Sequence, residues 1–270
     1  MRNLIPLLLA AAFTFLSCNQ EKTSEETTAV SEKPVVDSTK IFAVDSVKVI
    51  DSLRLDSNLV VNFESKLLVF PSLKDSLLLD SIYAPEKIKL KQYSKNSLKE
   101  ALNKKAKIYF AENKESLKSF TPTSAQSWNE HSQMDVESHE DGFLTIMYSG
   151  DGYTGGAHGY YYENYKVFDL LQKKTMQLSD LISDRDSKLW NRILMDNFLK
   201  DDIEKGQAEM LLVKEIPLNN NFYFDKKNLY FLYNQYEITA YAAGPVLIRV
   251  PYSAIKPLLK AEFKNRIGLQ

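Results

Sequence analysis

Residues 148–165 read YSGDGYTGGAHGYYYENY, and this stretch gives the most direct indication of the fold. It holds five of the nine glycines and six of the fifteen tyrosines in the chain, so its composition needs a geometric reason. Apolar, alternating residues precede it at 143–148 and follow it at 160–168. Alternation on both sides of a glycine-rich connection predicts an antiparallel strand pair. We expect a bulged hairpin whose glycines allow positive φ or close packing of neighbouring side chains.

Two other interpretations of these glycines are possible. A phosphate-binding loop requires a strand, spaced glycines and then a helix, whereas the residues after Gly159 alternate like a strand. A catalytic turn would use His158 as a general base with Asp151 or Asp169 nearby. The nearby serines lie in no G-x-S-x-G elbow of the kind that activates a nucleophile. The pattern therefore favours a hydrogen-bonded structural role for His158.

The tyrosines of the second strand divide between the two faces of the predicted sheet. Tyr160 and Tyr162 share one face, and Tyr161 and Tyr165 share the other, because side chains alternate along a strand. One pair must pack in the core, which leaves the other available to a ligand. A later Gly-Pro loop presents Tyr241 in a similar way, and loops on rigid sheets often carry recognition. The candidate binding residues are Tyr153, Gly155, Gly156, His158, Tyr160, Tyr241, Gly244 and Pro245.

The rest of the folded chain mixes strands and helices in no regular order. Strand-like alternation covers residues 46–55 and 58–70, and apolar residues at helical spacing cover 94–120 and 186–203. Ser94 or Ser97 can cap the first of these helices. The closing section predicts two strands around a turn at 225–228, a third strand at 246–250 and a short helix from Tyr252. This pattern predicts an α+β fold with antiparallel sheets, a few packed helices and two adjoining subdomains.

The N-terminal residues predict export and lipidation. Arg2 precedes an apolar run at 4–16, which is shorter than the roughly 20 residues that span a bilayer. Cys18, the only cysteine, follows Ser17 in a loose lipobox, so residues 1–18 predict a lipoprotein signal peptide with acylation at Cys18. An ordinary secretory signal is the alternative. Residues 19–44 are rich in Ser, Thr, Glu and Lys, a composition typical of a flexible tether.

Charge and spacing exclude some classes of partner. The formal net charge of −1 gives no electrostatic basis for nucleic-acid binding. His131 and His139 lie eight residues apart rather than at the i, i+4 spacing of a helical zinc site, so we expect neither a metal nor another cofactor. The predicted anchor places the protein in a bacterial cell envelope, lipid-anchored to a membrane, for which we expect the outer membrane.

The C-terminal half carries a family resemblance. It resembles the C-terminal domain shared by the bacterial proteins RsiV and PdaC, a domain of unknown function. Six motifs carry the resemblance, in the order Gly155–Gly159, Phe168–Leu170, Leu178–Leu181, Tyr236–Ile238, Tyr241–Gly244 and Ile248–Ser253. The resemblance implies an N-terminal PdaC-like α+β domain over residues 45–150 and an RsiV-type C-terminal α+β domain over residues 151–264.

The resemblance also implies a place for the protein rather than a reaction. In RsiV the extracytoplasmic part of this type binds lysozyme, and in PdaC the deacetylase chemistry lies in a separate domain. Neither the sigma-factor regulation of the first nor the deacetylation of the second is implied here. We therefore expect a non-enzymatic binding module for a protein or glycan, with lysozyme and peptidoglycan as candidates. A cell-wall hydrolase that uses His158 with a nearby aspartate, and a purely structural envelope component, are the alternatives.

Overall fold

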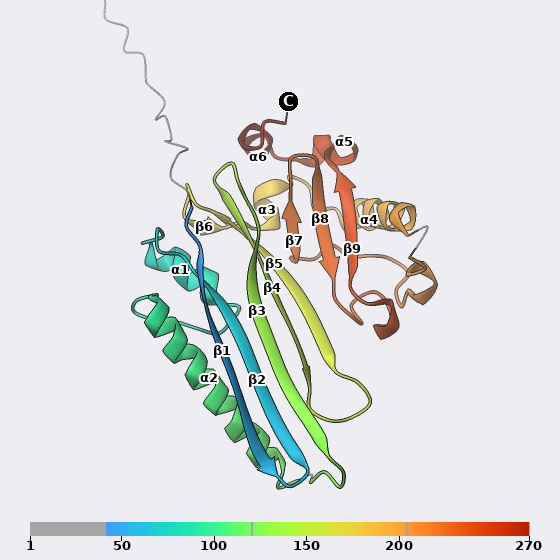
Figure 1. The fold of residues 1–270 in the computed structure, drawn as a ribbon. Helices are drawn as coiled ribbons and strands as arrows, with labels where there is room; N and C mark the ends of the chain where they lie inside the picture. Colours follow the sequence, from blue (N-terminus) through green and yellow to red (C-terminus); the bar gives the residue numbers. More distant parts are fainter. Residues whose placement is uncertain (1–41, 120, 203–204, 270) are drawn as a thin grey trace, which may run out of the picture. The chain divides into compact units, whose positions relative to one another are not determined.

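The computed structural model describes residues 42–119, 121–202 and 205–269 (Figure 1). The predicted signal peptide at 1–18, its lipidated Cys18 and most of the predicted tether at 19–44 lie outside the described residues. The folded part contains one six-stranded and one three-stranded sheet with helices beside them. The predicted α+β class is confirmed.

The larger sheet places its six strands in chain order, from β1 to β6. They are β1 (Asp45–Asp56), β2 (Leu59–Val69), β3 (Gln126–Glu140), β4 (Phe143–Tyr153), β5 (Tyr160–Asp169) and β6 (Lys174–Thr175). All neighbouring pairs are antiparallel except β2 and β3, which are parallel. A short turn cannot join parallel neighbours, so the chain crosses over through helices α1 (Ser76–Tyr83) and α2 (Lys95–Ser116).

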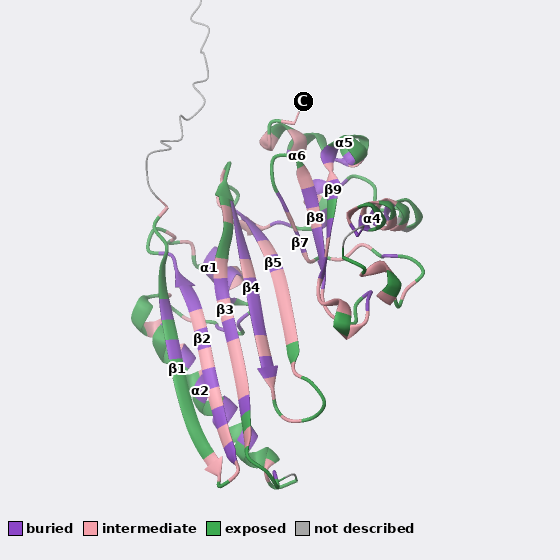
Figure 2. Ribbon diagram, turned by 45° about the vertical axis from the view of Figure 1, so that its right-hand side comes forward, coloured by how far each residue is buried: buried purple, intermediate pink, exposed green. Residues whose placement is uncertain are grey.

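Helix α2 covers one face of this sheet, as the helical spacing of its sequence predicts (Figure 1). The Ser94 side chain accepts a hydrogen bond from the Ser97 backbone N–H, and the Ser97 side chain accepts one from the Ser94 backbone N–H, which together form a capping box. Such a cap stabilises a helix by about 1 kcal/mol. Leu98, Leu102 and Phe110 are buried against the strands. Figure 2 shows the matching alternation of buried and half-buried residues along β2.

The smaller sheet forms the centre of a second core. It contains β7 (Phe222–Phe224), β8 (Asn228–Tyr233) and β9 (Val246–Pro251), which are antiparallel in that order, as predicted. The helices of this part are α3 (Leu178–Leu181), α4 (Ser187–Asp201), α5 (Tyr252–Ile255) and α6 (Ala261–Arg266), with 3₁₀ turns at Ala208–Met210, Tyr241–Ala243 and Lys256–Leu258. Trp190 of α4 is fully buried, and its ring meets Phe231 edge to face.

The two sheets are joined along β5, whose edge is only partly paired with β6. The Asn221 side chain accepts a hydrogen bond from the Tyr165 amide at 2.7 Å and donates one to the Glu163 carbonyl at 2.8 Å. The Asn234 side chain accepts from the Glu163 amide at 2.8 Å and donates to the same carbonyl at 3.0 Å. Two asparagine side chains therefore satisfy backbone groups that would otherwise form a free sheet edge.

The larger sheet contributes to both cores. Leu144 and Tyr148 of β4 belong to the core beneath α1 and α2, whereas Phe143 and Val167 belong to the core of the smaller sheet. The predicted boundary between residues 150 and 151 falls within β4. The division into two domains at that point stays a prediction. In the described segments, no helix has both the length and the apolar composition that a membrane crossing requires.

Candidate functional site

The glycines of β4 make room for tyrosine rings on β5. Gly152 pairs with Tyr160 and Gly150 with Tyr162 across the two strands. A Cβ atom on Gly152 would lie 2.5 Å from the Tyr160 hydroxyl oxygen, and one on Gly150 would lie 2.7 Å from that of Tyr162. Both distances are shorter than any van der Waals contact, so the rings can lie there only over glycine. Burial raises the pKa of Tyr162 to about 12.

The connection between β4 and β5 contains the glycines with left-handed backbone. Gly155 and Gly156 have φ values of +88° and +99°, which side chains with a Cβ rarely adopt. The Tyr153 hydroxyl donates a hydrogen bond to the Gly156 carbonyl at 3.0 Å and so closes the loop on itself. Within β4 and β5 the register runs without a shift, so the bulge predicted in this hairpin is absent from those two strands. The conformational freedom of glycine is used in the loop instead.

His158 follows this loop and is exposed to solvent. Its Nδ1 lies 2.8 Å from the Gly159 carbonyl oxygen, which can only accept, so Nδ1 carries the proton. The Nε2 atom is then an acceptor, and the Tyr236 hydroxyl lies 3.4 Å from it. The imidazole also packs against Tyr241, with ring centroids 4.2 Å apart. The predicted hydrogen bonding of His158 is confirmed, but the side chain is not buried.

His158, Tyr236 and Tyr241 together form what we call the aromatic cluster. Tyr236 is 58% exposed and has a positive φ of 66°, and its ring centroid lies 5.9 Å from that of Tyr241. Tyr241 is half-buried. The cluster therefore unites the glycine-rich loop with the loop between β8 and β9, two segments that the sequence marks as separate candidates. Tyr236 was not predicted as a site residue, although it lies in one of the motifs that carry the family resemblance.

Gly244 and Pro245 shape the second loop, and the Gly244 amide donates a hydrogen bond to the Tyr241 carbonyl at 3.1 Å. Gly244 ends the 3₁₀ turn Tyr241–Ala243 with a φ of +69°. The Gln207 side-chain amide donates to the Ala243 and Pro245 carbonyls at 2.8 Å and 3.1 Å. These bonds fix the loop that carries Tyr241, and a rigid loop loses little conformational entropy when it binds a ligand.

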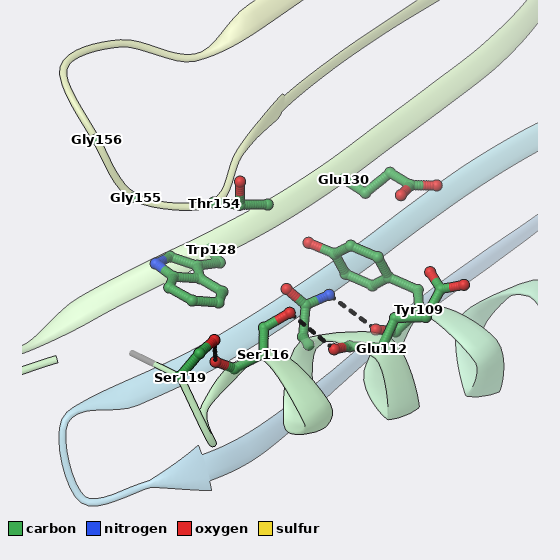
Figure 3. Close-up of a pocket in the computed structure, with 10 residues that line it drawn as sticks. Tyr109, Glu112, Ser116, Ser119, Trp128, Glu130, Thr154, Gly155 and Gly156 are labelled. Carbon is green, nitrogen blue, oxygen red and sulfur yellow. Dashed lines mark hydrogen bonds between the residues drawn. The ribbon is translucent and has the colours of Figure 1, made fainter. Parts of the chain in front are cut away.

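A cavity of about 560 Å³ lies beside the glycine-rich loop, between α2 and β3 (Figure 3). Its main lining residues are Tyr109, Glu112, Trp128, Glu130, Gly155 and Gly156, with four smaller polar side chains. Gly155 and Gly156, which are two of the predicted site residues, therefore line this cavity. The lining residues from α2 and β3 were not predicted, because no local motif links these elements across the crossover.

Two lining residues carry polar groups without a hydrogen-bond partner in the described part of the chain. Tyr109 is 7% exposed, and its hydroxyl makes no hydrogen bond there. Burial raises the pKa of this hydroxyl, Glu130 adds to the shift and the Asn113 side chain opposes it. Burial also raises the pKa of the Glu130 carboxyl, against the effect of Lys105. The Lys105 ammonium is itself held by Glu86 at 2.8 Å.

The two carboxylates considered as partners of His158 are bonded elsewhere. Asp151 lies 2.9 Å from Nδ1 of His131 across β3 and β4. Asp169 is 1% exposed and accepts from Arg266 at 2.7 Å. In the described residues His158 therefore has no hydrogen-bonded carboxylate. No group of three or more His, Cys, Asp or Glu side chains suited to a metal occurs in that part either.

Part of this chain matches the model of a known protein family. Residues 169–253 match the family model described as "Protein of unknown function (DUF3298)". This region resembles DUF3298. The match includes Tyr236 and Tyr241 of the aromatic cluster, and His158 lies before it. None of the curated proteins compared with the chain matches it.

Two crystal structures of DUF3298 proteins resemble the chain over most of its length. A family member from Bacteroides fragilis has a TM-score of 0.62 and 25% identity, with 84% of this chain and 96% of that chain covered. A DUF3298 protein from Pseudomonas aeruginosa PAO1 has a TM-score of 0.54 and 16% identity, with coverage of 83% and 97%, and supports the fold alone. The predicted resemblance to a domain family of unknown function is confirmed at this level.

Proposed function

We propose that this protein is a non-enzymatic binding module of the bacterial cell envelope, and that the aromatic cluster is its recognition surface. The observation that carries the proposal is the contact of His158 with Tyr236 and Tyr241, which gathers three rings from two loops at an exposed position. Contiguous aromatic surface that is exposed to water often marks a binding site, and tyrosine is enriched where binding energy concentrates.

The cluster suits recognition because its members are held in place before a ligand arrives. Tyr236 is positioned by a backbone hydrogen bond to Thr239 at 3.0 Å, and Tyr241 stands on the loop fixed by Gln207. A tyrosine ring has only two side-chain torsions, so its ordering costs little entropy. Its hydroxyl can also bond to a sugar or a peptide group while the ring covers apolar surface.

The remaining features of the proposal concern place and ligand. Acylation at Cys18 tethers the protein to a membrane through residues 19–44, and the outer membrane is the membrane we favour. The resemblance to the RsiV/PdaC-type domain, with its partner domain over residues 45–150, supports two ligands. These are lysozyme, which RsiV binds, and peptidoglycan.

The test measures anchoring and binding separately. Full-length protein in detergent is incubated with purified sacculi and with immobilised lysozyme, and we expect retention by one of them. Protein retained by neither would remove both ligand claims. Labelling of cells with a fatty-acid analogue should mark the wild type, whereas Cys18→Ala should stay unlabelled. An unlabelled wild type would exclude the anchor without bearing on the aromatic cluster.

A further inference from the structure

The cavity between α2 and β3 is a site distinct from the aromatic cluster, since no residue of the cluster lines it. Among the described residues, its lining contains two carboxylates, Glu112 and Glu130, and no lysine, arginine or histidine. Two buried aromatic side chains, Tyr109 and Trp128, also line it. A cation near carboxylates and aromatic rings is attracted both by the negative charge of the carboxylates and by the negative potential over the ring faces.

The Tyr109 hydroxyl is a buried polar group of this lining, and the Asn113 side chain beside it lowers its pKa without reaching hydrogen-bond geometry. The side chain is more than nine-tenths buried, yet its oxygen has no hydrogen bond in the described protein. Figure 3 shows the ring extending from α2 toward β3, with the hydroxyl in the space between Trp128 and Glu130. A buried hydroxyl without a partner destabilises the fold, so a retained one calls for an explanation. A ligand with N–H groups would supply the missing bond.

Glu130 lacks a partner for a structural reason. It lies on the helix-facing side of β3, where its neighbours across the strands are Phe63 and Gly152. The ring over Gly152 is that of Tyr160, and no hydrogen bond joins its hydroxyl to Glu130 in the described residues. Of the two lysines that lower the pKa of Glu130, Lys105 has the larger effect, and it is engaged by Glu86. The carboxylate thus faces the cavity with no ion pair or hydrogen bond in the described residues.

We propose that this cavity binds an organic cation, an ammonium or guanidinium group on an alkyl stem. The charged group is held by Glu130 and Glu112, the Tyr109 hydroxyl accepts one of its N–H bonds, and the stem lies against Trp128. An anion is disfavoured by the two carboxylates, and a neutral ligand would bury Glu130 further without compensating its charge. Both a basic side chain of a polypeptide and a free polyamine have the required chemistry.

The two tryptophans of the chain allow the site to be observed with an internal control. Trp128 lines the cavity, whereas Trp190 is fully buried in the core of the smaller sheet. In a ¹H–¹⁵N spectrum of the full chain, the Trp128 indole signal should shift and saturate on addition of Nα-acetyl-arginine amide or Nα-acetyl-lysine amide. The Trp190 signal should stay fixed. The neutral isostere Nα-acetyl-citrulline amide should leave both unchanged, and spermidine tests the polyamine source.

Three variants locate the binding energy. Glu130→Gln should lower the affinity for the arginine probe about tenfold or more, because it removes a charge-assisted hydrogen bond. Tyr109→Phe should lower the same affinity by about threefold, which is the effect of one ordinary hydrogen bond, without loss of thermal stability. Glu100→Gln, an equal charge change at an exposed position of α2 outside the lining, should leave the affinity unchanged.

Clear outcomes decide the proposal. Tighter binding of the amino-acid amides than of spermidine identifies a basic side chain as the source, and the reverse order identifies a polyamine. Equal shifts with arginine and citrulline probes would overturn the proposal. So would an affinity that is unchanged in a folded Glu130→Gln variant, or the absence of saturation up to about 10 mM. Failure of this test leaves lysozyme and sacculus binding by the aromatic cluster unaffected.

Discussion

The imidazole of His158 packs at a tilt of 31° on the ring of Tyr241, with centroids 4.2 Å apart, although the two residues belong to loops of different sheets. The contact links the glycine-rich connection after β4 to the turn before β9. Because the Asn221 and Asn234 side chains also join the sheets along β5, the cluster has support from both cores. A recognition surface assembled in this way depends on the fold of the whole described unit.

The two strand glycines should differ in their tolerance of alanine. A Cβ on Gly150 would lie 2.6 Å from the His131 carbonyl oxygen, which is part of the neighbouring strand and cannot move aside. We expect Gly150→Ala to cost about 1–3 kcal/mol of unfolding free energy. The three atoms nearest a Cβ on Gly152 all belong to the side chain of Tyr160, which is 46% exposed and can rotate away, so Gly152→Ala should cost less than about 1 kcal/mol. Urea unfolding of both variants checks this, and equal costs would contradict it.

Asn221 should contribute more to stability than an asparagine on the surface. Asn221→Ala leaves the Tyr165 amide without its partner and removes one of the two hydrogen bonds that the Glu163 carbonyl accepts, the other coming from Asn234. Both of the bonds that Asn221 makes are partly buried. The expected loss of unfolding free energy is about 2 kcal/mol. Asn191→Ala removes a bond to Glu215 in an exposed position and should change the free energy by less than about 0.5 kcal/mol. A similar small effect at Asn221 would show that β5 does not need this support.

Asp169 should make the protein sensitive to acid. Burial acts to raise the pKa of this carboxyl, but the Arg266 guanidinium and the backbone N–H groups of Gln172 and Leu171 outweigh it, so the pKa is lowered. The native state therefore binds the proton less readily than the unfolded chain. The resulting stability is present above the ordinary pKa of about 4 and is lost as the pH falls through the lower native pKa.

The matching variant separates this effect from general acid unfolding. Asp169→Asn breaks a buried ion pair and should cost about 3 kcal/mol at neutral pH. Urea unfolding free energies measured at pH steps below about 4 should fall less steeply in the variant than in the wild type. Parallel profiles for the two proteins would contradict the assignment.

Glu130 should have the opposite dependence on pH. Burial raises the pKa of its carboxyl, with Glu112 and Glu86 adding to the shift and Lys105 and Lys87 opposing it. A raised pKa means that the native state holds the proton more tightly. Its contribution to stability is fully present below the ordinary pKa and is lost as the pH rises through the native value.

Glu130→Gln mimics the protonated form of the Glu130 carboxyl, so the variant should be the more stable protein wherever the wild-type carboxyl is ionised. The melting temperature of the variant should match that of the wild type near pH 4 and exceed it near pH 7. Differential scanning calorimetry at the two pH values measures the difference. A variant less stable than the wild type near pH 7 would show that the Glu130 carboxylate has a stabilising partner. That result would also weaken the case for a cation site.

The sequence allowed the principal elements to be predicted where their periodicity was strong. Helix α2, strands β1 and β2, and the three closing strands follow directly from apolar spacing. Helix α1 was missed because it is short and follows Pro71, which marks a break but not what comes after it. Strand β3 was not predicted, since its outward face carries Asn129, His131 and Gln133.

The candidate site could be predicted only in pieces. The glycine-rich loop and the Tyr241 loop stand out in composition, but nothing in the sequence indicates that they meet. The tyrosine faces were assigned by parity alone: Tyr165 is buried, as a core member should be, while Tyr161 on the same face is only half-buried. The cavity could not be predicted from the sequence either, because Tyr109 and Glu130 come together only through the crossover that joins the parallel strands β2 and β3.

The aromatic cluster is tested most directly by the affinity of a variant that keeps the fold. Tyr236→Ala and Tyr241→Ala are compared with the wild type by calorimetric titration with whichever of lysozyme or solubilised peptidoglycan retains the protein, and thermal melting serves as the control. Loss of a central tyrosine should weaken binding by about 2 kcal/mol, or roughly thirtyfold, with a nearly unchanged melting temperature. Wild-type affinity in both folded variants would contradict the proposal that this surface binds the ligand.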